Sequence, residues 1–148
     1  MLGTRGARAA LAHLLHESDY RYIGIFRFSD GNATAVIHYD REAPGQLWTT
    51  EVPDTATYCC YVRDSGGAFT TANAMEDVRL AQHPAREAVQ AYCGVPVMDS
   101  GGVLLGTLCH YDHVPRDPAQ LDFALLLQVA VALEQGQHIP PYSASRAG

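Results

Sequence analysis

The sequence predicts a single α+β domain, an antiparallel sheet with helices before, between and after its strands. Two pairs of predicted strands, 20–28 with 33–39 and 91–98 with 103–111, are each joined by a turn rich in Gly, Asp, Asn and Ser, as in β-hairpins. Apolar residues at helical spacing mark both ends of the chain. Its 148 residues and 47% hydrophobic content fit one globular domain.

The N-terminal segment is predicted to be an amphipathic helix that ends at Ser18-Asp19. Its apolar positions form one helical stripe, made of Ala7, Leu11, Leu14 and Leu15. Arginines ahead of a short apolar run also loosely resemble a signal peptide, but two histidines interrupt the run and no small-residue cleavage site follows. We therefore expect a cytoplasmic protein whose four cysteines are reduced thiols.

The last helix is expected to start at Asp117-Pro118, an N-cap residue followed by proline at the first helical position. It is apolar nearly all round, so it needs two covering surfaces. One is the sheet, and the other is the N-terminal helix or a second subunit, with Leu126 and Val131 as candidate interface residues. The domain is expected to span residues 1–137, and residues 138–148 are expected to be a disordered tail.

The middle of the chain has a less regular pattern. Residues 41–53 are predicted to be a loop, because they contain two prolines and a glycine. Asp54 is expected to cap a short helix through Val62, and a short strand is expected at 68–72. Pro84 can occupy the first turn of a helix that runs to Gln90.

Charge and composition argue against several classes of protein. The net charge of −6 and the pI near 5.5 argue against a nucleic-acid partner, and no apolar run approaches the ~18 residues of a membrane helix. The chain contains no lysine, which excludes Schiff-base catalysis and a P-loop lysine. The spacing of Cys59, Cys60, Cys93 and Cys109 lacks the C-x-x-C pairs of a structural zinc site, so no metal site is predicted. Nothing in the sequence names a cofactor.

Several segments resemble, in order, those of a known family. They are 54–59 (DTATYC), 73–79 (NAMEDVR) with His83-Pro84, 91–97 (AYCGVPV), and 106–109 (GTLC) with Asp112 and Pro115-Arg116. Together they resemble the middle of a GAF domain, and the resemblance covers about residues 5–135. The sequence is most similar to small bacterial GAF proteins that stand alone or sit at the head of signalling proteins.

The resemblance implies a sheet of about six antiparallel strands with the terminal helices on one face. On the other face it implies a small-molecule pocket under inner helices and long loops, and it implies that the terminal helices pair two subunits into a homodimer. The N-K-F-D-E type signature of cyclic-nucleotide-binding members is absent. Cys109-His110 is similar to the Cys-His of phytochrome-like members, but it lies in the last strand, so a covalent bilin is not expected.

The second predicted hairpin can be assigned face by face. A four-residue turn at 99–102 pairs Met98 with Val103, and therefore Tyr92 with Cys109. Because side chains alternate, one face carries Tyr92, Gly94, Pro96, Leu105, Thr107, Cys109 and Tyr111, and the other carries Ala91, Cys93, Val95, Val97, Leu104, Leu108 and His110. The first, mixed set fits a pocket wall and the second, aliphatic set fits a helix-covered face. His110 and His113 are expected to be surface or loop-anchoring groups.

The candidate ligand-binding residues are Tyr58, Cys59, Asp77, Arg79, His83, Tyr92, Thr107, Cys109 and Tyr111. Arg79 has two interpretations: an ion pair with Asp77 that fastens a loop, or a planar, bidentate contact to an anionic ligand. Each cysteine is either a small buried hydrophobic residue or part of a thiol site. A redox or metal site would require Cys59 and Cys109 to converge, with or without His83.

The predicted function is a sensor in which a small ligand fills the pocket and shifts a dimer or a partner contact. The chain shows no kinase, cyclase or DNA-binding segment, so we expect a separate protein to receive the signal. No catalytic residue is predicted, because no nucleophile motif such as G-x-S-x-G is present. Two alternatives stay open: a redox or haem sensor with Cys and His ligands, and an enzyme like the GAF-fold free methionine-R-sulfoxide reductases. The cysteine-containing loop motifs of those reductases do not match this sequence.

Overall fold

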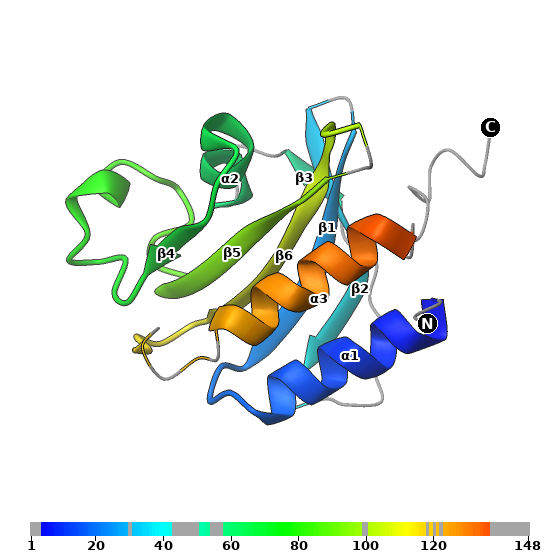
Figure 1. Cartoon of the computed structure of the whole chain (residues 1–148). Coiled ribbons are helices and arrows are strands. Elements are labelled where there is room, and N and C mark those ends of the chain that lie inside the picture. Colours follow the sequence, from blue (N-terminus) through cyan, green and yellow to red (C-terminus); the bar gives the residue numbers. More distant parts are fainter. Residues whose placement is uncertain are drawn as a thin grey trace.

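In the computed structural model, six strands form one antiparallel sheet in the order β3-β2-β1-β6-β5-β4, with helices packed on it (Figure 1). The elements in chain order are α1 (Thr4–His16), β1 (Tyr22–Ser29), β2 (Asn32–Asp40), β3 (Glu51–Pro53), α2 (Cys59–Ser65), β4 (Phe69–Thr71), the 3-10 helix η2 (Val78–Leu80), β5 (Ala91–Met98), β6 (Leu104–Asp112) and α3 (Phe123–Gly136). The structure describes residues 4–29, 31–42, 51–53, 58–98, 101–117, 119, 121 and 123–136. The α+β class and the six-stranded sheet are confirmed, and the predicted tail at 138–148 lies outside the described residues.

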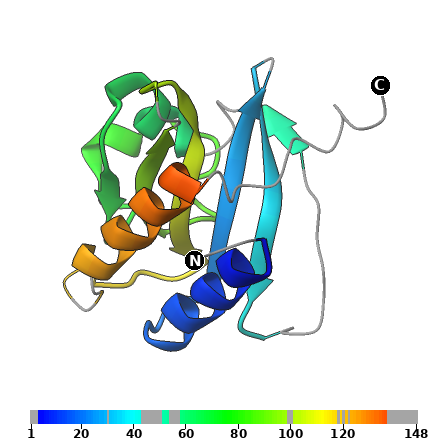
Figure 2. The ribbon, with the colours of Figure 1, turned by 45° about the vertical axis from the view of Figure 1, so that its right-hand side comes forward.

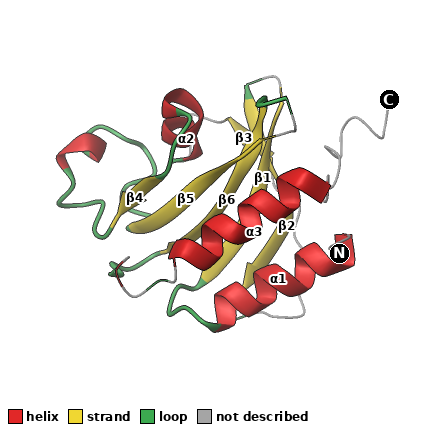
Figure 3. Ribbon diagram, in the orientation of Figure 1, coloured by secondary structure: helices red, strands yellow, loops and turns green. Residues whose placement is uncertain are grey.

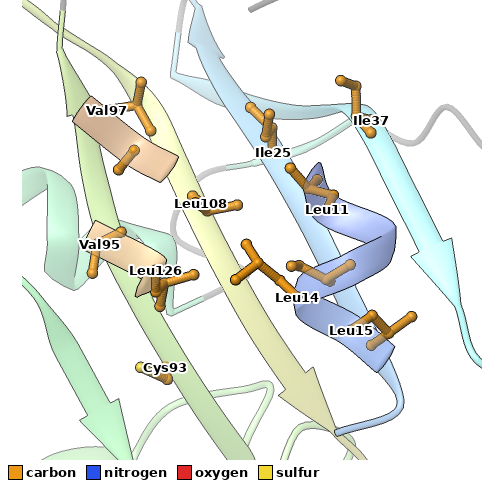
Figure 4. Packing of buried hydrophobic residues seen from close by; sticks show 12 residues of the cluster. Leu11, Leu14, Leu15, Ile25, Ile37, Cys93, Val95, Val97, Leu108 and Leu126 are labelled. Atoms are coloured by element: carbon orange, nitrogen blue, oxygen red, sulfur yellow. The ribbon is translucent and has the colours of Figure 1, made fainter. Parts of the chain in front are cut away.

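The face of the sheet that α1 and α3 cover, here called the outer face, holds an aliphatic core. Figures 1 and 2 show α1 lying over β1 and β2, and α3 lying over β5. In Figure 4, Leu11 of α1 lies beside Ile25, and Leu126 of α3 lies beside Val95. The buried members of this core are Leu11, Leu14, Leu15, Ile23, Ile25, Ile37, Cys93, Val95, Val97, Leu108, Leu126 and Ala130.

The opposite face of the sheet, here called the inner face, carries aromatic, thiol and small side chains. The helix α2 lies on this side (Figure 2), and the connection from β4 to β5 is mostly loop apart from η2 (Figure 3). The buried cluster on this face is formed by Phe26, Ala33, Ala35, Tyr58, Cys59, Val62, Phe69, Ala74, Leu80, Tyr92 and Cys109. The two faces therefore differ in chemistry as the sequence pattern predicts.

Two predictions between β2 and β4 are corrected. The expected loop at 41–53 contains β3, which pairs with β2 from Asn32 to Thr34. β3 is an edge strand of the sheet, and an edge strand tolerates a residue such as Pro53 that has no N–H to donate. The helix expected from Asp54 begins at Cys59 instead, with Tyr58 at the N-cap position and no side-chain capping bond. Asp54 itself lies outside the described residues.

Two expected helices also differ. Residues 84–88 form turns, because the His83 imidazole accepts a hydrogen bond from the Ala85 N–H and so fixes a local turn. The last helix starts at Phe123, since the Asp117 carboxylate accepts from the Ala119 N–H at 2.9 Å and closes a turn there. Among the described helices, none is both long and apolar enough to span a membrane.

The register of the second hairpin differs from the prediction by two residues. Tyr92 pairs with Tyr111, not with Cys109, because the connection from Met98 to Leu104 is longer than a four-residue turn and the ladder is irregular beside Val97. An even slip preserves the faces, so the prediction that Cys93 and Cys109 point to opposite faces is confirmed. Beyond the irregularity Leu105 departs from the predicted pattern and packs against the outer core.

Two residue assignments on the outer face were wrong. His110 is buried there, not at the surface, with its ring 5.4 Å from that of Tyr20. Leu126 is 1% exposed and belongs to the outer core, so it is not an interface residue; Val131, in contrast, is 46% exposed. The cause is the helical phase of α3, which turns Leu126 and Ala130 toward the sheet.

Two neighbouring leucines of α3 test this phase. Leu126→Ala should lower the free energy of unfolding by about 2–5 kcal/mol, because it removes buried methyl groups and leaves a cavity. Leu127→Ala, at a side chain 40% exposed, should lower it by less than about 1 kcal/mol. Urea unfolding measures both values, and equal losses would contradict this orientation of α3.

Candidate functional site

The inner face of the sheet is organised as rows of side chains across its three central strands. The pairings of β6 with β1 and β5 place three residues in each row. The rows are Tyr22–Tyr111–Tyr92, Gly24–Cys109–Gly94 and Phe26–Thr107–Pro96. We call the side chains of Tyr22, Phe26, His38, Tyr92, Thr107, Cys109 and Tyr111 the floor.

The glycines of the middle row leave space that their neighbours fill. A Cβ at Gly94 would lie 2.3 Å from the Tyr92 hydroxyl, so the tyrosine ring covers this glycine. A Cβ at Gly24 would lie 3.1 Å from both the His38 and the Phe26 rings. The two glycines thus allow larger side chains to lie flat on the sheet around Cys109.

Two thiols and two hydroxyls meet at the centre of the floor; we call Cys59, Tyr92, Thr107 and Cys109 the thiol cluster. The Cys59 Sγ atom is 3.2 Å from the Thr107 Oγ1 atom, and the Tyr92 hydroxyl donates to Cys59 Sγ at 3.5 Å. Cys109 lies two residues from Thr107 on the same face of β6 and opposite Gly94, which the Tyr92 ring covers. Burial raises the pKa of Cys109 and that of Tyr92 well above their usual values, so both groups are neutral at pH 7.

Tyr58 and His83 lie next to the thiol cluster. The Tyr58 hydroxyl donates to the Val89 carbonyl at 2.6 Å, its ring meets that of Tyr92 edge-on, and burial raises its pKa to about 12. The His83 ring packs against Tyr58 with centroids 4.7 Å apart, and its Nε2 atom is 4.0 Å from the Sγ atom of Cys60. The sulfur contact of His83 is thus with Cys60, while Cys59 and Cys109 lie in the same buried cluster.

Asp77 and Arg79 lie at the edge of the inner face, beside β4. Their side chains form an ion pair of 2.6 Å, and the guanidinium also donates to the Thr70 carbonyl at 2.7 Å and stacks on the Phe69 ring. The Arg79 guanidinium lowers the pKa of Asp77 to about 2. These contacts fasten the β4–β5 connection to β4, which is the loop-fastening interpretation of Arg79.

Sequence reasoning did not select His38, Tyr22 or Phe26, which belong to the same floor. The His38 Nε2 atom is hydrogen-bonded to the Tyr111 hydroxyl, and the Tyr111 ring stacks on that of Tyr22 with centroids 4.7 Å apart. Burial lowers the pKa of His38 to about 4 and raises that of Tyr111. Side-chain alternation along β1 and β2 could have selected them, but only once β1 was known to pair with β6.

The arginines at the rim of the floor are held by carboxylates. Arg21 lies over the Tyr22 ring, and Asp40 binds its guanidinium with two hydrogen bonds of 2.9 and 3.1 Å. Arg79 is bound by Asp77 in the same way. In the part of the chain that the structure describes, no group of three or more His, Cys, Asp or Glu side chains is placed to hold a metal ion.

A family comparison agrees with this arrangement of sheet, helices and floor: the model of the GAF domain matches residues 5–136. The chain belongs to the GAF domain family. The β6 segment Gly106-Thr107-Leu108-Cys109, on which the resemblance partly rested, supplies two members of the thiol cluster. The 54–57 part of the first matching segment lies outside the described residues.

Other relatives of this GAF domain are diverse. The cyclic di-GMP phosphodiesterase PA2567 of Pseudomonas aeruginosa is 32% identical over 80 residues, which are 51% of this chain and 14% of that protein. Free methionine-R-sulfoxide reductase from Neisseria meningitidis has a similar structure, with a TM-score of 0.67 and 17% identity over 88% of this chain and 75% of that one. The GAF domain of an Acinetobacter phosphoenolpyruvate-protein phosphotransferase gives a TM-score of 0.66 with 13% identity, over 88% and 78%. These two structural likenesses show a shared fold.

The buried imidazole of His38 gives a testable pH dependence. Its pKa is about 4 in the folded protein, against about 6.5 when unfolded, so the unfolded state binds more protons between these values. Stability should therefore fall as the pH drops from 7 to 5, by about 1–2 kcal/mol from this residue. His38→Gln, which keeps a hydrogen-bonding side chain without the titration, should show a smaller loss in urea unfolding at the two pH values. An unchanged pH dependence would contradict the neutral, buried state of His38.

Proposed function

We propose that this GAF domain is a sensor that binds a small molecule on the inner face and passes the signal through a dimer or to a separate partner protein. The observation that carries the proposal is the floor itself, where hydroxyl, thiol and imidazole groups are buried at positions that aliphatic side chains would fill more favourably. Buried polar groups beside aromatic rings are typical of ligand sites. The similar segment of a cyclic di-GMP phosphodiesterase supports a role in signalling.

We further propose that the ligand is an uncharged, planar molecule. The described side chains of the floor are neutral at pH 7, since the pKa of His38 is lowered and that of Cys109 is raised. The rim arginines Arg21 and Arg79 are already bonded to carboxylates, so an anion would have to compete with them. The rings of Tyr22, Phe26 and Tyr111 supply flat apolar surfaces for a planar molecule.

A thermal-shift screen tests the proposed ligand class. Uncharged heteroaromatic compounds should raise the melting temperature, because ligand binding stabilises the native state, while phosphate, nitrate and nucleotides should not. Thr107→Val removes a floor hydroxyl and should weaken ligand binding by about 1 kcal/mol, roughly fivefold in affinity. The melting-temperature shift at a given ligand concentration should therefore be smaller. The matched control is Thr70→Val, whose hydroxyl contacts Cys93 on the other side of the sheet. Selective binding of anions, or equal losses in both variants, would contradict the proposal.

We propose a homodimer through the outer helices. Phe123, Leu127 and Val131 lie four residues apart on α3 and are 38–46% exposed, so they form an apolar stripe along the helix. An exposed stripe of this kind is typical of a helix that packs against a second subunit. The family resemblance points to the same helices.

Sedimentation velocity tests the proposed dimer. Val131→Glu should give monomers, because two charges would be buried at the interface without partners. Val78→Glu is the matched control, since Val78 is 88% exposed on η2, away from α3, and should leave the dimer intact. A dimeric Val131→Glu protein would place the interface elsewhere.

We propose a sensor in preference to a thiol-dependent reductase. The thiolate is the reactive form of cysteine, and burial of Cys109 disfavours that form, so turnover by this thiol at neutral pH would be slow. We also propose that the protein works in the cytoplasm, where the reduced state of its four cysteines is maintained.

A further inference from the structure

Two cysteines far apart in the chain meet on the inner face. Cys59 is the first residue of α2, and Cys109 lies in β6 between Leu108 and His110. Both side chains are buried in one cluster with Tyr92. Cys59 contacts the Tyr92 and Thr107 hydroxyls, while Cys109 lies two residues from Thr107 on the same face of β6 and opposite Gly94, which the Tyr92 ring covers. The cluster thus holds two thiols among the same neighbours, one on the helix and one on the sheet.

We propose that Cys59 and Cys109 form a reversible dithiol–disulfide pair, which fastens α2 to the sheet when the protein meets hydrogen peroxide. A disulfide needs two cysteines whose Cβ atoms approach closely, and the shared neighbours Tyr92 and Thr107 bring the two thiols into one buried region. This inference rests on the contacts of the two thiols and does not depend on the proposed ligand.

The chemistry takes two steps. One thiol, deprotonated as it attacks, is oxidised by peroxide to a sulfenic acid, and a water molecule leaves. The second thiol attacks the sulfenic sulfur, the S–S bond forms, and a second water leaves. Two thiols and one peroxide thus yield one disulfide and two waters, and an external dithiol reverses the change.

Burial makes this pair slow to react, since only the thiolate attacks peroxide and burial disfavours that form. Hydrogen peroxide is small and uncharged, so burial hinders its approach to a sulfur atom less than it hinders a larger oxidant such as a disulfide compound. The pair is therefore expected to respond to sustained exposure and not to brief pulses.

The other two cysteines serve as internal controls. Cys93 lies in the outer core with Thr70 as its partner, on the opposite side of the sheet from Cys109. Cys60 follows Cys59 on α2, but successive helical residues point about 100° apart, and its sulfur faces His83. Neither is placed to bond with Cys109.

The experiment uses the full chain, reduced and then freed of reductant, in two double variants. Cys60→Ser with Cys93→Ser keeps the proposed pair, and Cys59→Ser with Cys109→Ser removes it. The protein is exposed to hydrogen peroxide, its remaining thiols are blocked, and it is digested with trypsin. Because the chain has no lysine, trypsin cleaves it only after arginine and releases peptide 42–63 with Cys59 and peptide 87–116 with Cys109. Mass spectrometry should find the two peptides joined in wild type and in the first variant, and separate after dithiothreitol.

The oxidised first variant should also melt about 5–10 °C higher than its reduced form, because the cross-link restricts the unfolded chain. Peptides that stay separate in the first variant, carry sulfinic acid instead, or join two copies of the chain would overturn the inference. The first variant gives this answer even if the second fails to fold. Ligand binding by the reduced protein is measured separately, so failure of either proposal is distinguishable from failure of the other.

Discussion

The pairing of β1 with β6 is the contact on which the rest of the structure depends. It joins one hairpin from each half of the chain and runs from Tyr22 opposite Tyr111 to Arg27 opposite Gly106. At its end the strands come so close that a Cβ at Gly106 would lie 2.0 Å from the Phe26 carbonyl oxygen and 2.9 Å from the Arg27 Cα atom. Both are backbone atoms that cannot rotate away, so any other residue would force the strands apart.

This pairing also decides which chemistry lies on which face. A shift of one residue would exchange the faces of β6, and so would bring Cys109 under α3 and Leu108 onto the floor. With the observed register, the aliphatic residues lie together under the terminal helices, where they stabilise the fold. The thiols, hydroxyls and His38 lie together on the inner face, where His38 is hydrogen-bonded to Tyr111, and Cys59 to Tyr92 and Thr107.

Sequence reasoning predicted the fold class, both hairpins and the faces of β5 and β6, because side-chain alternation depends only on neighbouring residues. It failed where the outcome depends on contacts distant in the chain. The two-residue register error came from the loop and ladder irregularity beside Met98, and β3 was missed because three residues give too short a pattern. His38 joined the floor only through the β1–β6 pairing, which no local pattern of residues signals.

The convergence of Cys59 with Cys109 shows the same limit, since α2 had to be placed over β6 before the two thiols could be seen to meet. The helix α2 has seven residues and no side-chain cap, so its position depends on tertiary contacts such as those of Val62 and the Cys59 thiol. Hydrogen bonds of sulfur are weak, so a ligand or a cross-link at the thiol cluster can compete with them. In β6, Cys109 is flanked by Leu108 and His110, which point to the outer face. A displacement of β6 at the thiol cluster therefore reaches the packing under α3 directly, through neighbouring residues of one strand.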